Sequence, residues 1–317
     1  MEKKEQLQNI KHSLFGHMND PLMKVLKKIN FVFGKSLNAE ELQKHRRFIE
    51  RLGQMAAPKD DVTVDEFCVG DINCEAITPE IAHNPEYIIL YAHGGGYNCG
   101  GLNYARILGG KMALFTGLKV VTFDYRLAPE HPYPAALDDC ITLWDHLTGE
   151  GYDPDHIIVA GDSAGGNLAL CLVQKLKALD RALPKGLLLF SPWTDMTCSN
   201  HSYETNFEID PILTRKYVLS AAKVYVNDQG ELSDPAFSPI NGDLSGFPPV
   251  YIMAGKNEIL LDDSRKLKDR IEKSGGSVIL DIEKSGWHVY QLFPIPQARS
   301  AMKRLSEHVS GLLYNKP

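Results

Sequence analysis

A serine between small residues is the first feature of the sequence that could carry chemistry. The stretch Gly161-Asp162-Ser163-Ala164-Gly165 fits the pattern G-x-S-x-G and stands between an apolar run at 157–160 and a helical pattern at 164–179. A sharp turn from strand to helix exposes a serine hydroxyl above a sheet, and small neighbours are needed because the serine backbone is strained. The N-terminus of the following helix favours negative charge. The pattern therefore predicts Ser163 as a nucleophile, with a plain loop of small residues as the alternative.

A second glycine-rich stretch, His93-Gly94-Gly95-Gly96, ends another apolar run. Glycines let backbone N–H groups approach a substrate closely, and such donors stabilise the oxyanion that forms when serine attacks a carbonyl. The N–H of Ala164 would complete this oxyanion hole. A plain turn is the alternative, whereas a phosphate loop is disfavoured because Cys99 stands where the third glycine of Gly-x-Gly-x-x-Gly belongs. We expect His93 to be a structural hydrogen-bonding residue rather than a base.

Serine is a weak nucleophile without a base, and the chain has 11 histidines. In α/β-hydrolase chains the order is serine, acid, histidine, each beyond the C-terminal end of a strand. His288 follows the apolar run at 277–282 and fits the last place in this order. His308 also comes late, but it falls in a helical pattern, where we expect it at the surface. The sequence predicts His288 as the base, which then protonates the leaving group.

The acid should follow the apolar run at 250–254. Glu258 is the first carboxylate after that run, and it is predicted to orient His288 and to stabilise its imidazolium. Asp262 and Asp263 are the alternatives, one helical turn later. We expect Asp262 to serve instead as an N-cap of a helix at 262–274.

The elements that must position these residues alternate along the chain. After a hairpin pattern at 62–69 and 72–77, short apolar runs typical of strands covered on both faces occur at 87–91, 119–123, 157–160, 186–190, 250–254 and 277–282. Helical patterns occur at 105–115, 135–147, 164–179, 262–274 and 298–312. This alternation predicts an α/β fold with a mostly parallel central sheet flanked by helices.

Two segments depart from the alternation. The start of the chain has a helical pattern, and 195–246 is longer than one crossover needs and contains a helical pattern near 213–226. We predict an N-terminal helical cap segment at 1–57, a first part of the catalytic core at 58–194, a cap insertion at 195–246 and a second part of the core at 247–317. Packing on the core and opening as a lid at a lipid surface are both compatible with the N-terminal pattern.

Composition sets outer limits on function. The chain has 317 residues, 44% of them apolar, and a formal net charge of −6. These values are ordinary for a globular protein, and the mild acidity disfavours a nucleic-acid partner. The sequence predicts no transmembrane segment, no metal and no cofactor, and its six scattered cysteines lack the C-x-x-C spacing of a zinc or redox site. We expect a cytoplasmic protein with buried thiols, and a homodimer is the commonest oligomeric state for such a chain.

Four stretches together resemble the hormone-sensitive-lipase group of α/β-hydrolase carboxylesterases, also called the bacterial family IV esterases. They are HGGG at 93–96, DYRLAPEHPYPAALDD at 124–139, GDSAGG at 161–166, and NEILLDD at 257–263 with GWH at 286–288. The resemblance runs from about residue 60 to the C-terminus. It implies the α/β-hydrolase fold, a cap over the sheet, and hydrolysis of small carboxylic esters, usually with short acyl chains.

The resemblance also implies roles for individual residues. The triad would be Ser163, Glu258 and His288, and the oxyanion donors would be Gly95, Gly96 and Ala164. Gly94 would hold the turn, and Asp162 would brace a neighbouring loop. Many relatives have Asp where this chain has Glu258, a difference that the longer side chain can accommodate.

Two further expectations follow from these motifs. In the stretch 124–139 an ion pair between Asp124 and Arg126 would brace the HGGG loop. For the activity, a lactone hydrolase or an amidase on the same triad is the alternative, and a true lipase acting at an oil interface is another. A non-catalytic small-molecule receptor of this fold is disfavoured, because all three triad side chains are present.

Overall fold

The computed structural model describes residues 39–58, 60–81 and 84–314. Within these ranges one sheet contains eight strands in the order β1-β2-β4-β3-β5-β6-β7-β8. The strands are β1 Val62–Val69, β2 Ile72–Pro79, β3 Ile88–Ala92, β4 Lys119–Phe123, β5 Ile157–Asp162, β6 Gly186–Phe190, β7 Val250–Gly255 and β8 Val278–Glu283. β2 pairs antiparallel with β1 and with β4, and all other neighbouring strands are parallel. The mostly parallel sheet predicted from the sequence is confirmed.

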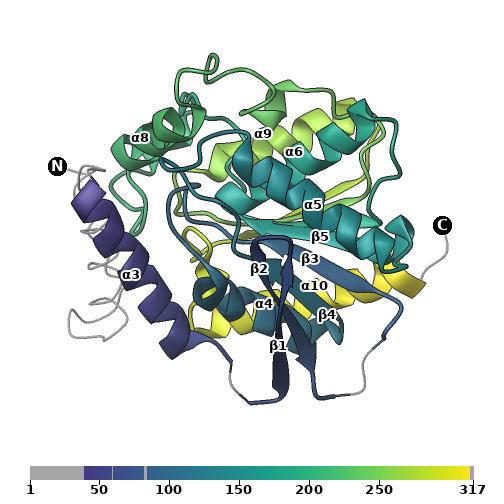
Figure 1. The fold of residues 1–317 in the computed structure, drawn as a ribbon. Helices are drawn as coiled ribbons and strands as arrows, with labels where there is room; N and C mark the ends of the chain where they lie inside the picture. The colour runs from purple at the N-terminus through teal and green to yellow at the C-terminus, as the bar shows by residue number, and fades with distance from the viewer. Residues whose placement is uncertain (1–38, 59, 82–83, 315–317) are drawn as a thin grey trace.

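Helices cover both faces of this sheet (Figure 1). They are α3 Ala39–Ala56, α4 Leu102–Thr116, α5 Ala135–Gly149, α6 Ala164–Ala178, α7 Ser202–Thr205, α8 Arg215–Val226, α9 Leu261–Lys273 and α10 Pro296–Tyr314, with short 3₁₀ turns at Pro154–His156, Pro239–Asn241 and Tyr290–Leu292. α4 packs with α10 on one face, and α5 packs with α6 on the other. Because both faces are covered, every residue of β3, β5, β6 and β7 is buried.

The last strand differs from the expectation. The run at 277–282 was expected to be covered on both faces, but β8 ends the order of the sheet and most of its residues are only half-buried. Ile279 in this strand is 51% exposed. An apolar composition alone does not separate an edge strand from a central one, because that depends on the order of strands in the sheet.

The two segments expected to form the cap contain the helices α3, α7 and α8. α3 packs against α4, and α8 begins where the Thr214 hydroxyl accepts a hydrogen bond of 3.2 Å from the N–H of Tyr217. Figure 1 shows α3 and α8 at the same side of the molecule although they are distant in sequence. The N-terminal part of the first segment, 1–38, lies outside the described residues, so its helical pattern stays a prediction.

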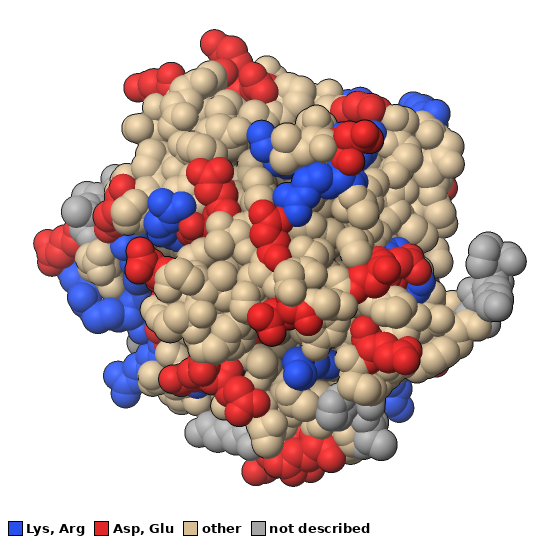
Figure 2. Space-filling model, turned by 45° about the vertical axis from the view of Figure 1, so that its right-hand side comes forward, with Lys and Arg blue, Asp and Glu red and all other residues tan. Residues whose placement is uncertain are grey.

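The surface agrees with the modest net charge of the chain. On the face in Figure 2 acidic and basic side chains are interspersed rather than gathered by sign. Within the part of the chain that the structure describes, no helix is both long and apolar enough to cross a bilayer.

Candidate active site

Ser163 lies in the turn between β5 and α6 with a backbone φ of 53° and ψ of −118°. This left-handed conformation is strained for a residue with a side chain. The turn is also crowded, since a Cβ added to Gly161 would lie 2.1 Å from the carbonyl oxygen of Gly165, and one on Gly165 would lie 2.0 Å from that of Ala92. The glycines of the motif are therefore required by space, and the turn that they permit exposes the serine side chain.

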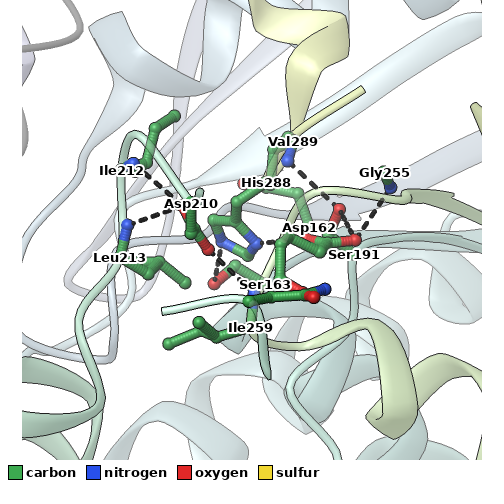
Figure 3. A network of polar contacts seen from close by, with 12 residues as sticks. Asp162, Ser163, Ser191, Asp210, Ile212, Leu213, Gly255, Ile259, His288 and Val289 are labelled. Atoms are coloured by element: carbon green, nitrogen blue, oxygen red, sulfur yellow. Dashed lines mark hydrogen bonds and ion pairs between the residues drawn. The ribbon is translucent and has the colours of Figure 1, made fainter. Parts of the chain in front are cut away.

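Three side chains predicted from the sequence meet in a hydrogen-bonded chain, and two of them, Ser163 and His288, are labelled in Figure 3. Oγ of Ser163 lies 3.0 Å from Nε2 of His288, and Nδ1 of His288 lies 2.8 Å from Oε2 of Glu258. Since a carboxylate only accepts, Nδ1 of His288 carries the proton and Nε2 is left to accept from the serine. Glu258 is fully buried and His288 is 5% exposed. The histidine and glutamate of this chain are thus buried, while Ser163 is half-buried and lines a cavity.

The second oxygen of Glu258 is held by residues that the sequence analysis missed. Oε1 of Glu258 accepts hydrogen bonds from the Ser191 hydroxyl at 3.0 Å and from the N–H of Gly255 at 2.8 Å. The Ser191 hydroxyl in turn accepts from the N–H of Val289 at 3.1 Å. One buried serine therefore links the acid to the residue after the histidine. Its place directly after the strand 186–190 was the available signal.

The alternative acids and the alternative base lie elsewhere. Asp263 is buried and accepts from the N–H groups of Thr194 and Asp195. α9 begins at Leu261, and its N-cap Leu260 supplies no side-chain bond, so the expected N-cap role of Asp262 is wrong. Asp262 accepts instead from the N–H of Ser202.

His308 is also placed differently from the expectation. A surface position was predicted from its helical pattern, but its ring stacks on Tyr251 with ring centroids 4.3 Å apart, and burial lowers its pKa.

The glycine-rich loop presents backbone to the same site. Gly94 is engaged already, since its N–H donates to Oδ1 of Asp162 at 2.7 Å. Gly95 and Gly96 have φ values of 115° and 63°, and both line the cavity beside Ser163. Ala164 is the first residue of α6, so its N–H has no acceptor within the helix. The N–H groups of Gly95, Gly96 and Ala164 are thus available near the serine.

Asp162 and His93 support this loop from beneath. Asp162 is fully buried, and its carboxylate also accepts from the hydroxyls of Tyr91 at 2.6 Å and Tyr104 at 2.7 Å. Nδ1 of His93 donates to the carbonyl of Gly94 at 2.7 Å. Burial lowers the pKa of His93 to about 4, so the ring is neutral near pH 7.

The stretch 124–139 braces the loop differently from the expectation. Arg126 pairs with Asp139, with 2.7 Å between Nη2 and Oδ1, so the predicted pair with Asp124 is wrong. Asp124 is held by its backbone N–H, which donates to Asn73, and burial raises the pKa of its carboxyl to about 6. The contact of this stretch with the glycine-rich loop is a hydrogen bond between uncharged groups: the Tyr125 hydroxyl donates to the carbonyl of His93 at 2.7 Å.

A cavity of about 560 Å³ opens beside Ser163 and His288. Its walls include residues of three segments that are distant in sequence: Ile49, Leu52, Met55 and Ala56 of α3, Tyr217, Val218 and Ala221 of α8, and Val289 and Leu292–Pro294 after the histidine. Among the described residues that line it there is no Asp, Glu, Lys or Arg. The described walls of the cavity are therefore suited to an uncharged, apolar molecule.

A serine on a strand-to-helix turn of a mostly parallel sheet, with a histidine beyond the last strand, defines the α/β-hydrolase class of proteins. A family model described as alpha/beta hydrolase fold matches residues 89–292. An esterase of Acinetobacter venetianus is 36% identical over 227 residues, which cover 71% of this chain and 75% of the relative. An acetyl-hydrolase of Streptomyces hygroscopicus is 31% identical and covers 80% of this chain and 83% of the relative.

Solved structures agree with these relatives. An esterase from the bacterial hormone-sensitive lipase family superposes with a TM-score of 0.86 at 30% identity, covering 94% of this chain and 100% of the other. A hormone-sensitive lipase from a metagenome library gives a TM-score of 0.85 at 30% identity, covering 92% and 98%. The chain belongs to the hormone-sensitive-lipase-like family of α/β hydrolases. It is a carboxylesterase.

Proposed function

We propose that ester hydrolysis proceeds through an acyl-enzyme on Ser163, with His288 as the base and Glu258 as the orienting acid. The observation that carries the proposal is the unbroken chain of hydrogen bonds from Ser163 through His288 to Glu258. The serine oxygen attacks the ester carbonyl carbon while Nε2 of His288 takes its proton. The imidazolium then protonates the departing alcohol. In the second step His288 takes a proton from the water that attacks the acyl-enzyme, and it returns that proton to the oxygen of Ser163 as the carboxylic acid leaves. Glu258 stabilises the imidazolium without taking its proton.

We assign the oxyanion hole to the N–H groups of Gly95, Gly96 and Ala164. The engagement of the Gly94 N–H by Asp162 supports this assignment, because it leaves Gly94 to hold the turn. In this scheme Asp162 and His93 act on the loop and touch no substrate. Each oxyanion donor is worth roughly 10²–10³ in rate.

For the substrate we propose a neutral ester with a short acyl chain. The uncharged lining of the cavity and its volume of about 560 Å³ support a small apolar molecule. One relative is an acetyl-hydrolase, which supports the short acyl chain. The segments 1–57 and 195–246 form the cap in this proposal, since α3 and α8 supply two of the cavity walls.

The test is Ser163→Ala assayed with p-nitrophenyl esters of C2 to C12 acids. We expect the variant to fold and to lose at least about 10⁴-fold in kcat. The wild type should prefer the short esters and show a burst of p-nitrophenol if deacylation is slow. A variant that retains its activity would remove Ser163 from the mechanism. A panel of lactones and anilides compared by kcat/KM decides against the lactonase and amidase alternatives if the esters are faster.

We further propose a cytoplasmic, homodimeric protein. All six cysteines are unpaired, and five of them are buried, a usage that suits a reducing compartment. The partly exposed edge strand β8, with Ile279 on its surface, offers backbone groups that a second copy could pair with. Light scattering on the purified protein tests the dimer, and Ile279→Lys should give a monomer if β8 forms the interface.

A further inference from the structure

The backbone on either side of the Glu258 carboxylate is held by side chains of the insertion. Nδ2 of Asn206 donates to the carbonyl of Lys256 at 3.1 Å and to that of Glu258 at 2.8 Å. Oδ2 of Asp210 accepts from the N–H of Ile259 at 2.9 Å. Both side chains come from the loop between α7 and α8, more than 45 residues before the acid in sequence (the bonds span 49 to 52 positions). The peptide groups of the acid loop are thus positioned from outside the sheet.

Asp210 also connects this loop to the wall of the cavity. It is only 4% exposed, and its Oδ1 accepts from the N–H groups of Ile212 at 2.8 Å and Leu213 at 2.9 Å. Ile212 and Leu213 line the cavity beside Ser163. One carboxylate therefore joins the substrate-side wall to the acid loop, as Figure 3 shows.

The charge of Asp210 bears on the histidine as well. Burial raises the pKa of Asp210 to about 6, and the positive charge of His288, when protonated, acts to lower that pKa. The other groups around His288 are Glu258 and Ser163, which touch it, and Asp162, which interacts with it through space. Above pH 6 the imidazolium therefore has a further buried negative charge nearby, which comes from the insertion.

We propose that Asn206 and Asp210 are positioning residues of the ester hydrolysis, which hold the acid loop in register and place a carboxylate beside His288. This inference rests on the proposed triad. The imidazolium forms in the transition states of both chemical steps, so an acid loop that loosens costs rate more than binding. Misplacement of a catalytic group by about 1 Å can cost 10²-fold.

The experiment compares Asp210→Asn, Asn206→Ala and wild type in kcat, KM and the pH profile of kcat/KM with p-nitrophenyl butyrate. We expect both variants to lose about 10-fold or more in kcat, with KM within about threefold. Asp210→Asn also removes a negative charge beside the base, so its acid limb should move to lower pH. Asn206→Ala removes no charge, so its acid limb should stay in place. Thermal unfolding of each variant shows that the assayed protein is folded.

The control is Asp263→Asn, another buried carboxylate that accepts backbone N–H groups, in this case those of Thr194 and Asp195 rather than one of the acid loop. Its acid limb should match that of wild type. Wild-type kcat in Asn206→Ala, or an unmoved acid limb in a folded Asp210→Asn, overturns the proposal. If Asp210→Asn fails to fold, the kcat of Asn206→Ala decides. Ser163→Ala is assayed alongside these variants. If Ser163→Ala keeps its activity, the triad itself is rejected. If Ser163→Ala is inactive but the Asn206 and Asp210 variants behave like wild type, only the roles of Asn206 and Asp210 are rejected.

Discussion

The hydroxyl of Ser191 donates a hydrogen bond of 3.0 Å to Oε1 of Glu258, on the side of the carboxylate that faces away from His288. The same hydroxyl accepts from the N–H of Val289, the residue that follows His288. Ser191 is fully buried and its φ is 47°, so the end of β6 is shaped to bring it there. The loops that carry Glu258 and His288 are thereby linked to each other through one oxygen atom.

Ser191→Ala should therefore reduce catalysis and stability together. The substitution leaves the buried N–H of Val289 without its acceptor, which costs about 1–3 kcal/mol. It also releases one of the bonds that orient Glu258, so we expect kcat to fall by about 10-fold with little change in KM. Steady-state kinetics and urea unfolding measure the two effects.

Ser285→Ala is the matched control for this prediction. Its hydroxyl donates to Glu283 at 2.9 Å and lies outside the hydrogen-bonded chain of the site. Wild-type kcat is expected for Ser285→Ala, and an equal loss in both serine variants would contradict a specific role for Ser191.

The sequence predicted the parts of the site that local constraints determine. A strained turn demands glycines around Ser163, and the order of motifs along the chain restricts where an acid and a base can stand. Glu258 and His288 were predicted on that basis, and the structure places His288 in hydrogen-bonded contact with both Glu258 and Ser163. Ser191 was not predicted, because it contacts Val289, which is 98 positions away in sequence. Such contacts depend on the order of strands in the sheet, which alternation of strand and helix does not determine.

The predicted ion pair between Asp124 and Arg126 was wrong for a similar physical reason. Asp124 and Arg126 are two positions apart and of opposite charge, which made them the obvious partners in sequence. In the structure the N–H of Asp124 still donates to the carbonyl of Asn73 in β2. Arg126 lies beside α5, where the Asp139 carboxylate accepts from its guanidinium at 2.7 Å. The partner of Arg126 is therefore determined by the packing of α5, which begins nine residues further on, at Ala135.

The two glycines assigned to the oxyanion hole should differ in their tolerance of a side chain. A Cβ on Gly95 would lie 2.0 Å from the carbonyl oxygen of Cys99, and the φ of 115° disfavours any other residue. Gly95→Ala must therefore move the loop, and we expect kcat to fall by about 10²–10³. A Cβ on Gly96 would meet no atom closer than the Tyr217 hydroxyl at 3.2 Å, so the strain there comes mainly from the left-handed φ of 63°, which costs a residue with a side chain about 1–2 kcal/mol. Gly96→Ala should lose less than about 10-fold, and the reverse ranking in kcat would count against this loop geometry.

The contacts of Arg46 hold α3 against the body of the protein. Its guanidinium donates to the carbonyls of Asn98 at 2.8 Å and Ala128 at 2.9 Å, and it forms an ion pair with Glu130 at 2.7 Å. α3 supplies one wall of the cavity. Arg46→Ala should loosen that wall and raise KM for apolar esters several-fold, since hydrogen bonds to charged groups are worth about 1.5–3 kcal/mol each. Michaelis kinetics with p-nitrophenyl butyrate measure it.

Lys44→Ala is the control on the same helix, because Lys44 pairs only with Glu40 and Glu41 of α3 itself among the described residues. Its KM should equal that of wild type.

With tributyrin, wild-type activity should rise smoothly through the solubility limit of the ester, because an α3 held by the contacts of Arg46 does not open at an interface. A sharp increase at that limit would favour the lipase alternative instead.

Asp263 should make stability depend on pH. Burial raises its pKa to about 7, above the value of about 3.9 for an unfolded chain. A carboxyl group with a raised pKa contributes stability that is fully present below about pH 4 and is lost as the pH rises through about 7. Asp263→Asn cannot ionise, so its free energy of unfolding relative to wild type should increase by more than about 1 kcal/mol between pH 5 and pH 8, because each unit of pKa shift corresponds to about 1.4 kcal/mol. Urea unfolding at both pH values measures this difference, with the neighbouring Asp262→Asn as the control. A difference between Asp263→Asn and wild type that is the same at both pH values would show that the carboxyl of Asp263 does not titrate in this window.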